Sequence, residues 1–588
     1  MEEKMVTLTI DGKKVTVPAN YTVMKAAYKL GINIPRLCFL EGVDESSSCR
    51  VCVVEIEGQR TLKNSCTMPI TEGMVVRTNT KRVIKAVREN LKLIAANHVF
   101  ECWRCPREHN CELITLLRRF DIYNEIGGNA SFKKRERVII GQNPAIELDS
   151  GKCTLCGRCI AACEKYSGLS ILAFNNRGAN TYVAPAMKTD FDEAGCMYCG
   201  KCIQACPTAG IHEVSYLTQV VDALRDPEKF VVVQAAPAVR AALAEEFGYP
   251  AGYDAEGKMY AAFKALGFDE IADVNWAADL TIMEEGTEFI SRINGKGPLP
   301  LFTSCSPGWI RYIETYAPEY LPNLSSCKSP HQMSGAMIKA YWSKKIGVDP
   351  KKIVVVSIMP CIAKKFEAAR PEMEVDGLRD VDYVLTTREL ARLIKREEVD
   401  FQALEEIKPD GQLAQYTGAG TIFGVTGGVM EAALRTVVEK LTGKELENVN
   451  FEAVRGMQEI KEASLNVNGM TVNVAVVHGG VAIKKFLDIL REGKKQYHFV
   501  EFMGCIGGCI NGGGQPILTA RGQELVDIKA KRASVLYKED ENHPLRKSHL
   551  NESMMLAYKE FLGEPNSKIA HKYLHTHYTK RDIFPNKD

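Results

Sequence analysis

The sequence predicts a multidomain protein that combines α+β and α/β parts. Its 588 residues exceed what one hydrophobic core usually holds, and length alone suggests three or four domains. Cysteines gather in tight sets within residues 38–206. After residue 215, apolar strand-like runs such as residues 230–234 and 352–358 alternate with helical segments. These observations divide the chain into residues 1–79, 80–138, 139–215, 216–525 and 526–588. We expect the last of these to be a small segment, and residues 571–588, which show no periodicity, to be an irregular surface tail.

The composition is that of an ordinary globular protein. Hydrophobic residues make up 45% of the chain, charged residues make up 25%, and the formal net charge is +2. This balance gives no electrostatic reason to expect binding to nucleic acid or to an anionic membrane. No apolar run approaches the roughly 20 residues needed to span a bilayer, and residues 1–6 lack the features of a secretory signal. We therefore expect a cytoplasmic protein with no membrane span and no nucleic-acid partner.

The first 79 residues have a β-rich pattern. Residues 6–10 alternate, Asp11-Gly12 is a hairpin signal, residues 15–17 form the return strand, and residues 22–30 resemble a short amphipathic helix. The cysteines that follow are Cys38, Cys49, Cys52 and Cys66. A Cys-x2-Cys pair with two flanking cysteines suits a 2Fe–2S cluster in a plant-type, β-grasp ferredoxin-like domain. A structural zinc site is the alternative.

Residues 80–138 carry a second ligand set. A helical pattern over residues 81–96 leads to the group His98, Cys102, Cys105 and Cys111. Three thiolates are one short of what a 4Fe–4S cubane needs, and a neutral histidine ring can supply the fourth ligand. The alternative is that His98 is an ordinary histidine. We expect a small domain with one 4Fe–4S cluster.

Residues 139–215 contain one cysteine pattern twice, about 43 residues apart. Each copy has the Cys-x2-Cys-x2-Cys-x3-Cys spacing of bacterial two-cluster ferredoxins, in which the fourth cysteine of each run ligates the other run's cluster. One cubane is therefore expected to bind Cys153, Cys156, Cys159 and Cys206. The other is expected to bind Cys196, Cys199, Cys202 and Cys163. With the preceding sets this makes one 2Fe–2S and three 4Fe–4S clusters, which together would conduct electrons.

Five cysteines lie beyond residue 215, in separate segments. Cys305 lies in Thr-Ser-Cys-Ser-Pro-Gly-Trp, and Cys361 lies in Met-Pro-Cys-Ile-Ala-Lys. Cys505 and Cys509 share the run Met-Gly-Cys-Ile-Gly-Gly-Cys-Ile-Asn-Gly-Gly-Gly, whose glycines allow close approach of the backbone. Cys327 stands alone and is expected to be a small buried thiol. The separated segments are expected to converge on one cubane with a further group attached.

These segments resemble the signatures of the FeFe hydrogenases, and the resemblance extends along nearly all of the chain, including the cluster series of the large clostridial-type members. It implies a catalytic subunit with a large α/β catalytic domain and an H-cluster. The H-cluster is a cubane joined through one cysteine to a two-iron unit that carries carbon monoxide, cyanide and an azadithiolate bridge. The implied reaction is the reversible reduction of two protons by two electrons to dihydrogen.

The resemblance also implies roles for individual residues around the H-cluster. Cys361, Cys505 and Cys509 match cubane ligands, and Cys509 also matches the bridge to the two-iron unit. Lys364 matches the donor to a cyanide. The residues that match the lining of the two-iron pocket are Ala236, Pro237, Met359 and Met503.

The proton path and the fourth cubane ligand depend on another group of residues. Glu285, Glu288 and Ser325 match the proton path of the family, although two glutamates three residues apart on a helix usually mark a solvated face. The family has two adjacent cysteines in its first signature, the first a proton relay and the second a cubane ligand. Here the second is Ser306. Strict alignment makes Cys305 the relay, whereas the preference of iron for thiolate makes Cys305 the fourth ligand, which we favour.

Two other functions and two sets of partners are compatible with these patterns. The cluster domains also resemble those of the large iron–sulfur subunit of NADH dehydrogenases, which would make the chain a non-catalytic electron-transfer subunit, and a dihydrogen sensor is a third possibility. As a hydrogenase, the chain could take electrons from ferredoxin alone. It could instead be the catalytic subunit of an NAD/ferredoxin-linked, electron-bifurcating complex with flavin-bearing, NADH-oxidising iron–sulfur subunits.

Overall fold

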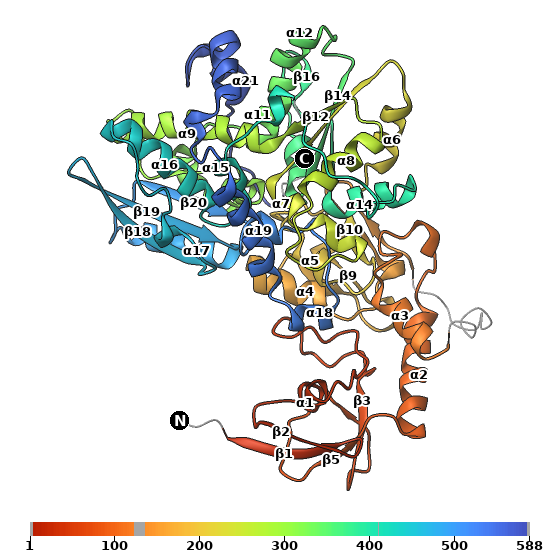
Figure 1. The fold of residues 1–588 in the computed structure, drawn as a ribbon. Helices are drawn as coiled ribbons and strands as arrows, with labels where there is room; N and C mark the ends of the chain where they lie inside the picture. Colours follow the sequence, from red (N-terminus) through yellow and green to blue (C-terminus); the bar gives the residue numbers. More distant parts are fainter. Residues whose placement is uncertain (1–3, 123–135, 410, 585–588) are drawn as a thin grey trace.

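The computed structural model describes residues 4–122, 136–409 and 411–584. The predictions for residues 1–3, for part of the segment 80–138 and for the last four residues of the tail lie outside this range. Figure 1 shows the N-terminal sheet at one end of the molecule, with the short helices α4 and α5 between it and the large C-terminal part. Within the described residues, no helix is both long and apolar enough to cross a membrane.

The N-terminal part is a five-stranded sheet in the order β2-β1-β5-β3-β4. Its strands are β1 (Met5–Ile10), β2 (Lys13–Pro18), β3 (Val53–Ile56), β4 (Lys63–Asn64) and β5 (Val75–Arg77). Strands β1 and β2 form the predicted hairpin, and β1 runs parallel to β5. Helix α1 (Val23–Lys29) begins after Thr22, whose hydroxyl accepts a hydrogen bond from the Lys25 amide. The apolar face of α1 packs into the same core as the sheet.

Two helices connect this sheet to the cysteine-rich part. Helix α2 (Lys81–Ala96) has the predicted bounds and begins at the capping side chain of Thr80. Its buried side chains follow one helical face and pack with those of α3 (Glu112–Arg119) in a shared core.

The segment from residue 136 to residue 215 is built from very short elements. A three-stranded sheet has the order β10-β7-β6, with β6 (Ile139–Ile140), β7 (Ile146–Asp149) and β10 (Ile211–Glu213). A hairpin joins β8 (Leu172–Asn175) to β9 (Tyr182–Pro185). Helices α4 (Arg158–Ala162) and α5 (Lys201–Ala205) occupy equivalent places in the two cysteine runs, as expected for an internal repeat.

The C-terminal part contains two four-stranded sheets. The first is parallel, in the order β12-β11-β14-β17, with β11 (Phe230–Ala235), β12 (Glu270–Asp273), β14 (Ile353–Met359) and β17 (Tyr383–Thr386). The second has the order β13-β20-β19-β18, with β13 (Leu301–Phe302), β18 (Ile460–Val467), β19 (Met470–His478) and β20 (Phe499–Met503). A small hairpin joins β15 (Glu374–Val375) to β16 (Leu378–Arg379).

Helices surround and connect the two sheets (Figure 1). Those between residues 216 and 525 are α6 (Leu217–Arg225), α7 (Pro237–Arg240), α8 (Glu256–Ala265), α9 (Val274–Ile293), α10 (Pro307–Tyr316), α11 (Pro330–Met337), α12 (Ser343–Ile346), α13 (Ala363–Ala368), α14 (Thr387–Arg396), α15 (Gly418–Thr421), α16 (Gly428–Thr442), α17 (Gly480–Glu492) and α18 (Ala520–Leu525). Helix α9 is buried along most of its length and contributes side chains to the cores of both sheets. It therefore links the two halves of this part.

The C-terminal segment packs more closely than a surface tail would. It contains α19 (Ile528–Asn542), α20 (Glu552–Ala557) and α21 (Lys568–Leu574). After α21 the backbone pairs with residues 326–328, since Lys328 N donates to Leu574 O at 2.7 Å and Thr576 N donates to Ser326 O at 2.8 Å. Residues 571–574, expected to be irregular, are helical because their apolar side chains join the core of the first sheet.

Candidate functional site

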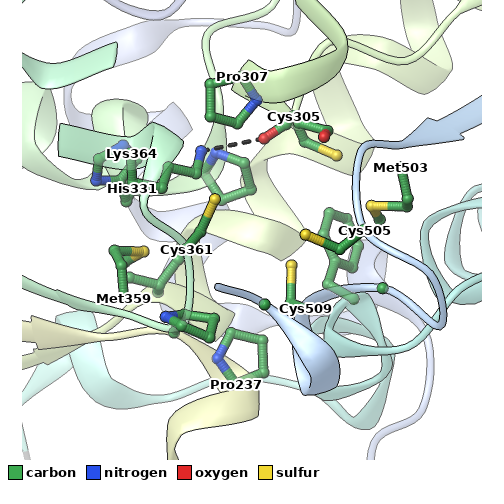
Figure 2. A pocket seen from close by; sticks show the side chains of 18 of the residues that line it. Pro237, Cys305, Pro307, His331, Met359, Cys361, Lys364, Met503, Cys505 and Cys509 are labelled. Atoms are coloured by element: carbon green, nitrogen blue, oxygen red, sulfur yellow. Dashed lines mark hydrogen bonds between the residues drawn. The ribbon is translucent and has the colours of Figure 1, made fainter. Parts of the chain in front are cut away.

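A largely apolar cavity lies where the carboxyl ends of strands from the two sheets meet. Ala236 and Pro237 reach it from the end of β11, Met359 from the end of β14 and Met503 from the end of β20. Figure 2 shows the side chains that surround it. The carboxyl ends of parallel strands are the usual place for a ligand or cofactor in α/β proteins.

Four cysteines line this cavity: Cys305, Cys361, Cys505 and Cys509. In Figure 2 the sulfur atoms of Cys361, Cys505 and Cys509 face a common space. Burial raises the pKa of Cys509 to about 12, and the charge of Cys505 adds to this rise. Burial also raises the pKa of Cys361, as do the charges of Cys505 and Cys509. Thiolates held this close in an apolar cavity need cations to compensate their charge, which the irons of a cluster supply.

The glycine-rich loop after β20 brings two of these sulfurs into position. Gly508 has φ +88°, which glycine adopts without strain, and an added Cβ there would lie 2.7 Å from Thr426 N. At Gly512 an added Cβ would lie 2.2 Å from Pro360 O. The loop therefore touches the segment that carries Cys361, and no side chain larger than hydrogen fits between them.

Lys364 extends from α13 toward the same cavity. Its Nζ donates to Cys305 O at 3.0 Å, as Figure 2 shows, and also to Glu367 Oε2 at 2.9 Å. Burial alone would raise the pKa of Glu367, but the charges of Lys364 and His331 lower it to about 2. The ammonium group is therefore held at the wall of the cavity by a buried carboxylate.

His331 is a cavity residue that the sequence did not reveal. It lies on α11, with Nε2 2.5 Å from Glu367 Oε2 and Nδ1 3.1 Å from Ser357 Oγ. Burial lowers the pKa of His331 to about 4, and the charge of Lys364 acts in the same direction. The only sequence signal was its place six residues after Ser325, which does not distinguish it from a histidine of the core.

Cys305 and Ser306 both line the cavity, but different groups act on their side chains. Burial raises the pKa of Cys305, and the strongest charge acting on it is that of Glu285. Ser306 Oγ accepts a hydrogen bond of 3.0 Å from Gly504 N, in the loop that carries Cys505. The choice of Cys305 as the fourth cubane ligand stays a prediction.

The predicted proton-path residues lie together, behind Cys305. Glu285 and Glu288 are on α9, and burial raises the pKa of Glu285 to about 8, with a further contribution from Glu288. Ser325 Oγ donates to Glu288 Oε2 at 2.8 Å, and Arg292 Nη2 donates to Glu288 Oε1 at 2.6 Å. The side chain of Glu285 is almost fully buried, whereas that of Glu288 is 14% exposed. The group thus extends from the cavity toward the surface.

The eight cysteines of the two-cluster segment line two small cavities in the predicted crossed combination. The first cavity is lined by Cys153, Cys156, Cys159 and Cys206. The second is lined by Cys163, Cys196, Cys199 and Cys202. Each site therefore takes its fourth thiol from the other run.

The N-terminal cysteines also lie close together. Cys52 Sγ is 3.4 Å from Cys66 Sγ, and a hydrogen bond from Cys49 lowers the pKa of Cys38 to about 6. For the set His98, Cys102, Cys105 and Cys111, the contacts differ between the cysteines and the histidine. Burial raises the pKa of Cys105 and that of Cys111, and the charge of Cys102 adds to the rise at Cys105, as that of Cys105 does at Cys111. The His98 ring packs against Phe100 at a centroid distance of 4.8 Å. The role of His98 as a ligand stays a prediction.

Four family models match successive parts of the chain. They are described as "2Fe-2S iron-sulfur cluster binding domain" for residues 3–81, "4Fe-4S dicluster domain" for residues 152–209, "Iron only hydrogenase large subunit, C-terminal domain" for residues 229–513 and "Iron hydrogenase small subunit" for residues 526–581. The match over residues 229–513 includes all four cysteines that line the cavity.

Individual relatives extend this similarity to the full chain. NADP-reducing hydrogenase subunit HndD of Solidesulfovibrio fructosivorans is 45% identical, over 98% of this chain and 99% of its own. Iron hydrogenase 1 of Clostridium pasteurianum is 44% identical, over 98% of this chain and 100% of its own. A solved structure of a variant of apo [FeFe]-hydrogenase HydA1 from Chlamydomonas reinhardtii is 40% identical, covers 62% of this chain and 99% of that one, and has a TM-score of 0.56. The chain therefore belongs to the iron-only, or FeFe, hydrogenases, as an iron–sulfur oxidoreductase.

Proposed function

We propose that this hydrogenase interconverts protons and dihydrogen, two protons and two electrons giving one dihydrogen molecule, at an H-cluster held in the cavity between the two sheets. The observation that carries the proposal is the convergence of Cys361, Cys505 and Cys509 on an apolar cavity that a buried acid, Glu285, adjoins. When bound, the H-cluster supplies the redox-active iron. The non-catalytic electron-transfer subunit is not retained, because hydrogenases match the chain over its full length.

The residues around the cavity would hold this cofactor and exclude water. Cys361, Cys505 and Cys509 would ligate the cubane, and Cys509 would also face the two-iron unit. Lys364, anchored by Glu367, would donate a hydrogen bond to a cyanide. The apolar wall that keeps water from the two-iron unit would be formed by Ala236, Pro237, Met359 and Met503.

Protons would reach the cavity through the acid and hydroxyl groups behind Cys305. Glu285 is neutral over a wide pH range because of its raised pKa, so it can both accept and donate a proton near neutral pH. Ser325 and Glu288 continue the path, and their hydrogen bond of 2.8 Å supports proton transfer between them. Cys305 would either exchange protons with Glu285 or act as the fourth ligand of the cubane.

Electrons would arrive through one 2Fe–2S and three 4Fe–4S clusters. The boundaries at residues 79, 138, 215 and 525 would separate a β-grasp ferredoxin-like domain, a His/Cys3 cluster domain, a two-cluster ferredoxin domain, the catalytic domain and a C-terminal segment. Support comes from the cysteine sets that the fold brings together and from the family matches to residues 3–81 and 152–209.

The partners would be further electron-transfer subunits. HndD is named as a subunit of an NADP-reducing hydrogenase, and its similarity covers 98% of this chain. We therefore propose a complex with flavin-bearing, NADH-oxidising iron–sulfur subunits, with ferredoxin as a second electron carrier in an electron-bifurcating reaction.

The test of function replaces one cavity cysteine and one matched buried cysteine. Cys361→Ser should lose the infrared bands of iron-bound carbon monoxide and cyanide and all dihydrogen evolution from reduced viologen. Cys327→Ser is the control, because Cys327 is fully buried but lies outside the cavity lining. It should retain both signals. Wild-type protein that assembles the H-cluster but evolves no dihydrogen would contradict the proposal.

The same assay assigns the fourth cubane ligand. Thiolate is the usual ligand of iron–sulfur clusters, so Cys305→Ala should abolish assembly of the cubane and Ser306→Ala should leave it intact. Iron analysis and the infrared bands report the outcome. The reverse pattern, in which only Ser306→Ala prevents assembly, would make Cys305 the proton carrier.

A further inference from the structure

Two cysteine loops that belong to different clusters are in direct contact. One loop contains Cys199 and Gly200 of the two-cluster segment, and the other contains Gly513 of the catalytic site. An added Cβ on Gly513 would lie 2.5 Å from Cys199 O, and one on Gly200 would lie 2.9 Å from Gly513 Cα. Cys505 Sγ lies 3.9 Å from Cys199 O. We call this contact the junction, formed by residues 199–201 together with 505 and 511–513.

Lys201 is buried at the junction and is bound to both loops. Its Nζ donates to Asn511 O and to Gln204 Oε1, each at 2.6 Å. Gln204 Nε2 in turn donates to Gly512 O at 2.8 Å. The side chains of α5 therefore hold the backbone of the catalytic-site loop, and the ammonium group lies between the two cysteine sets.

The charges around Lys201 are unusual for a buried ammonium group. Lys201 is 5% exposed. The charged groups that act on it most strongly are the thiols of Cys505 and Cys199. The next strongest charges are the like charges of Arg532 and Lys529, and Arg532 is itself paired with Glu245. No carboxylate is among these groups, although a buried cation is costly without a counter-charge.

We propose that Lys201 is the shared counter-charge of the two cubanes that meet at the junction, and that it controls the electron step between them. This inference rests on the proposed function. One electron would leave the cubane held by Cys163, Cys196, Cys199 and Cys202, and the same electron would reduce the cubane held by Cys361, Cys505 and Cys509. No proton or bond is exchanged in this step.

The direction of the effect follows from electrostatics. A 4Fe–4S cluster with thiolate ligands is anionic and gains one negative charge on reduction, and the charge near the cluster is one of the factors that set its potential. A fixed cation stabilises the reduced form of both neighbouring clusters. Removal of the cation therefore lowers both potentials, and electrons are harder to place on either side of the junction.

The test is a redox titration of the holoenzyme followed by electron spin resonance. Lys201→Met should lower the ratio of reduced to oxidised cubane about tenfold at the wild-type midpoint potential, a shift of about 59 mV for one electron. Gln204→Glu should act in the same direction, because the new carboxylate would pair with the ammonium group. Gln204→Met is the matched control. It removes the hydrogen bond to Gly512 without changing the charge, and its titration should match wild type.

Three outcomes distinguish an effect of the charge of Lys201 from an effect of its hydrogen bonds on the structure of the junction. An unchanged titration in Lys201→Met with full iron content would overturn the proposal, and so would an equal shift in Gln204→Met. If Lys201→Met fails to assemble its clusters, the comparison of Gln204→Glu with Gln204→Met still decides, since equal titrations in that pair contradict the role of charge. Failure of the proposed function would show separately, as wild-type protein without carbon monoxide and cyanide bands or without dihydrogen evolution.

Discussion

Glu285 shows how a single residue is adapted to its place. It lies on α9 beside two groups that disfavour its charged form, namely the apolar core and the carboxyl group of Glu288. Burial raises its pKa from 4.5 to about 8, so the side chain is neutral below that pH and charged above it. The adjacent Glu284 points elsewhere and accepts hydrogen bonds from Asn566 N at 2.8 Å and from His575. Neighbouring glutamates on one helix therefore have different roles.

Glu285→Gln should lower dihydrogen evolution by about 10²–10⁴-fold, because a proton relay loses its only titratable group at that point. The cluster bands in the infrared should not change. A protonated-carboxyl band should be present in wild type below pH 8, disappear as the pH rises through about 8, and be absent from Glu285→Gln. Glu284→Gln is the control and should keep both the band and the activity. Full activity of Glu285→Gln would mean that protons take another route.

The glycine-rich loop after β20 acts as a unit at the scale of a structural element. Strands β14 and β20 belong to different sheets, yet their carboxyl ends deliver cysteines to the same cavity. The loop can pass beside Pro360 only because Gly512 and Gly514 have no side chain, since an added Cβ at Gly514 would lie 3.0 Å from the carbonyl carbon of Pro360. Close contact between backbones, more than any single side chain, sets the spacing of the sulfurs.

Gly512→Ala should therefore disrupt cluster binding while the rest of the fold persists. The added methyl group would overlap Pro360 O, and overpacking of this kind costs about 1–3 kcal/mol. We expect loss of the cavity cluster in iron analysis, with the three 4Fe–4S signals of the N-terminal part retained. Gly522→Ala in α18 is the matched control, because its added Cβ would come no closer than 3.3 Å to Leu518 Cβ. Normal cluster content in Gly512→Ala would show that the loop can shift at little cost.

At the scale of the whole molecule, the N-terminal segment and the two-cluster segment lie on the same side of the catalytic part. The N-terminal sheet lies at one end, the two-cluster segment lies next to the catalytic part, and the junction at Lys201 joins the two (Figure 1). This order would place the segments that we propose to carry electrons between the surface and the cavity. The proposed proton-path residues Glu285 and Glu288 lie on α9, which is on another side of the catalytic part (Figure 1). Electrons and protons would thus reach the cavity by separate routes.

Cys199→Ser should remove or alter the cubane next to the junction and slow electron delivery to the cavity. Electron spin resonance should show the loss of one 4Fe–4S signal, and iron analysis should fall accordingly. The infrared bands of the H-cluster should persist, because its ligands are on other segments. An unchanged cluster count would contradict the assignment of Cys199 as a ligand.

The sequence alone determined the elements whose signals are local. The first hairpin, the helix over residues 81–96 and the strands at residues 230 and 353 were predictable, because capping, periodicity and turn residues act over a few positions. The two cysteine runs were also predictable as paired sites, since the crossed ligand pattern follows from their spacing.

Only the tertiary structure determined the contacts between segments that are far apart in the sequence. His331, the buried pairing of residues 575–576 with residues 326–327, and the contact of Gly200 with Gly513 have no local signal in the chain. The same holds for Lys201, which looks like a surface lysine in sequence and is buried only because the catalytic-site loop covers it. Charge and burial at such positions are properties of the packed whole, because both depend on which atoms the fold places around a side chain.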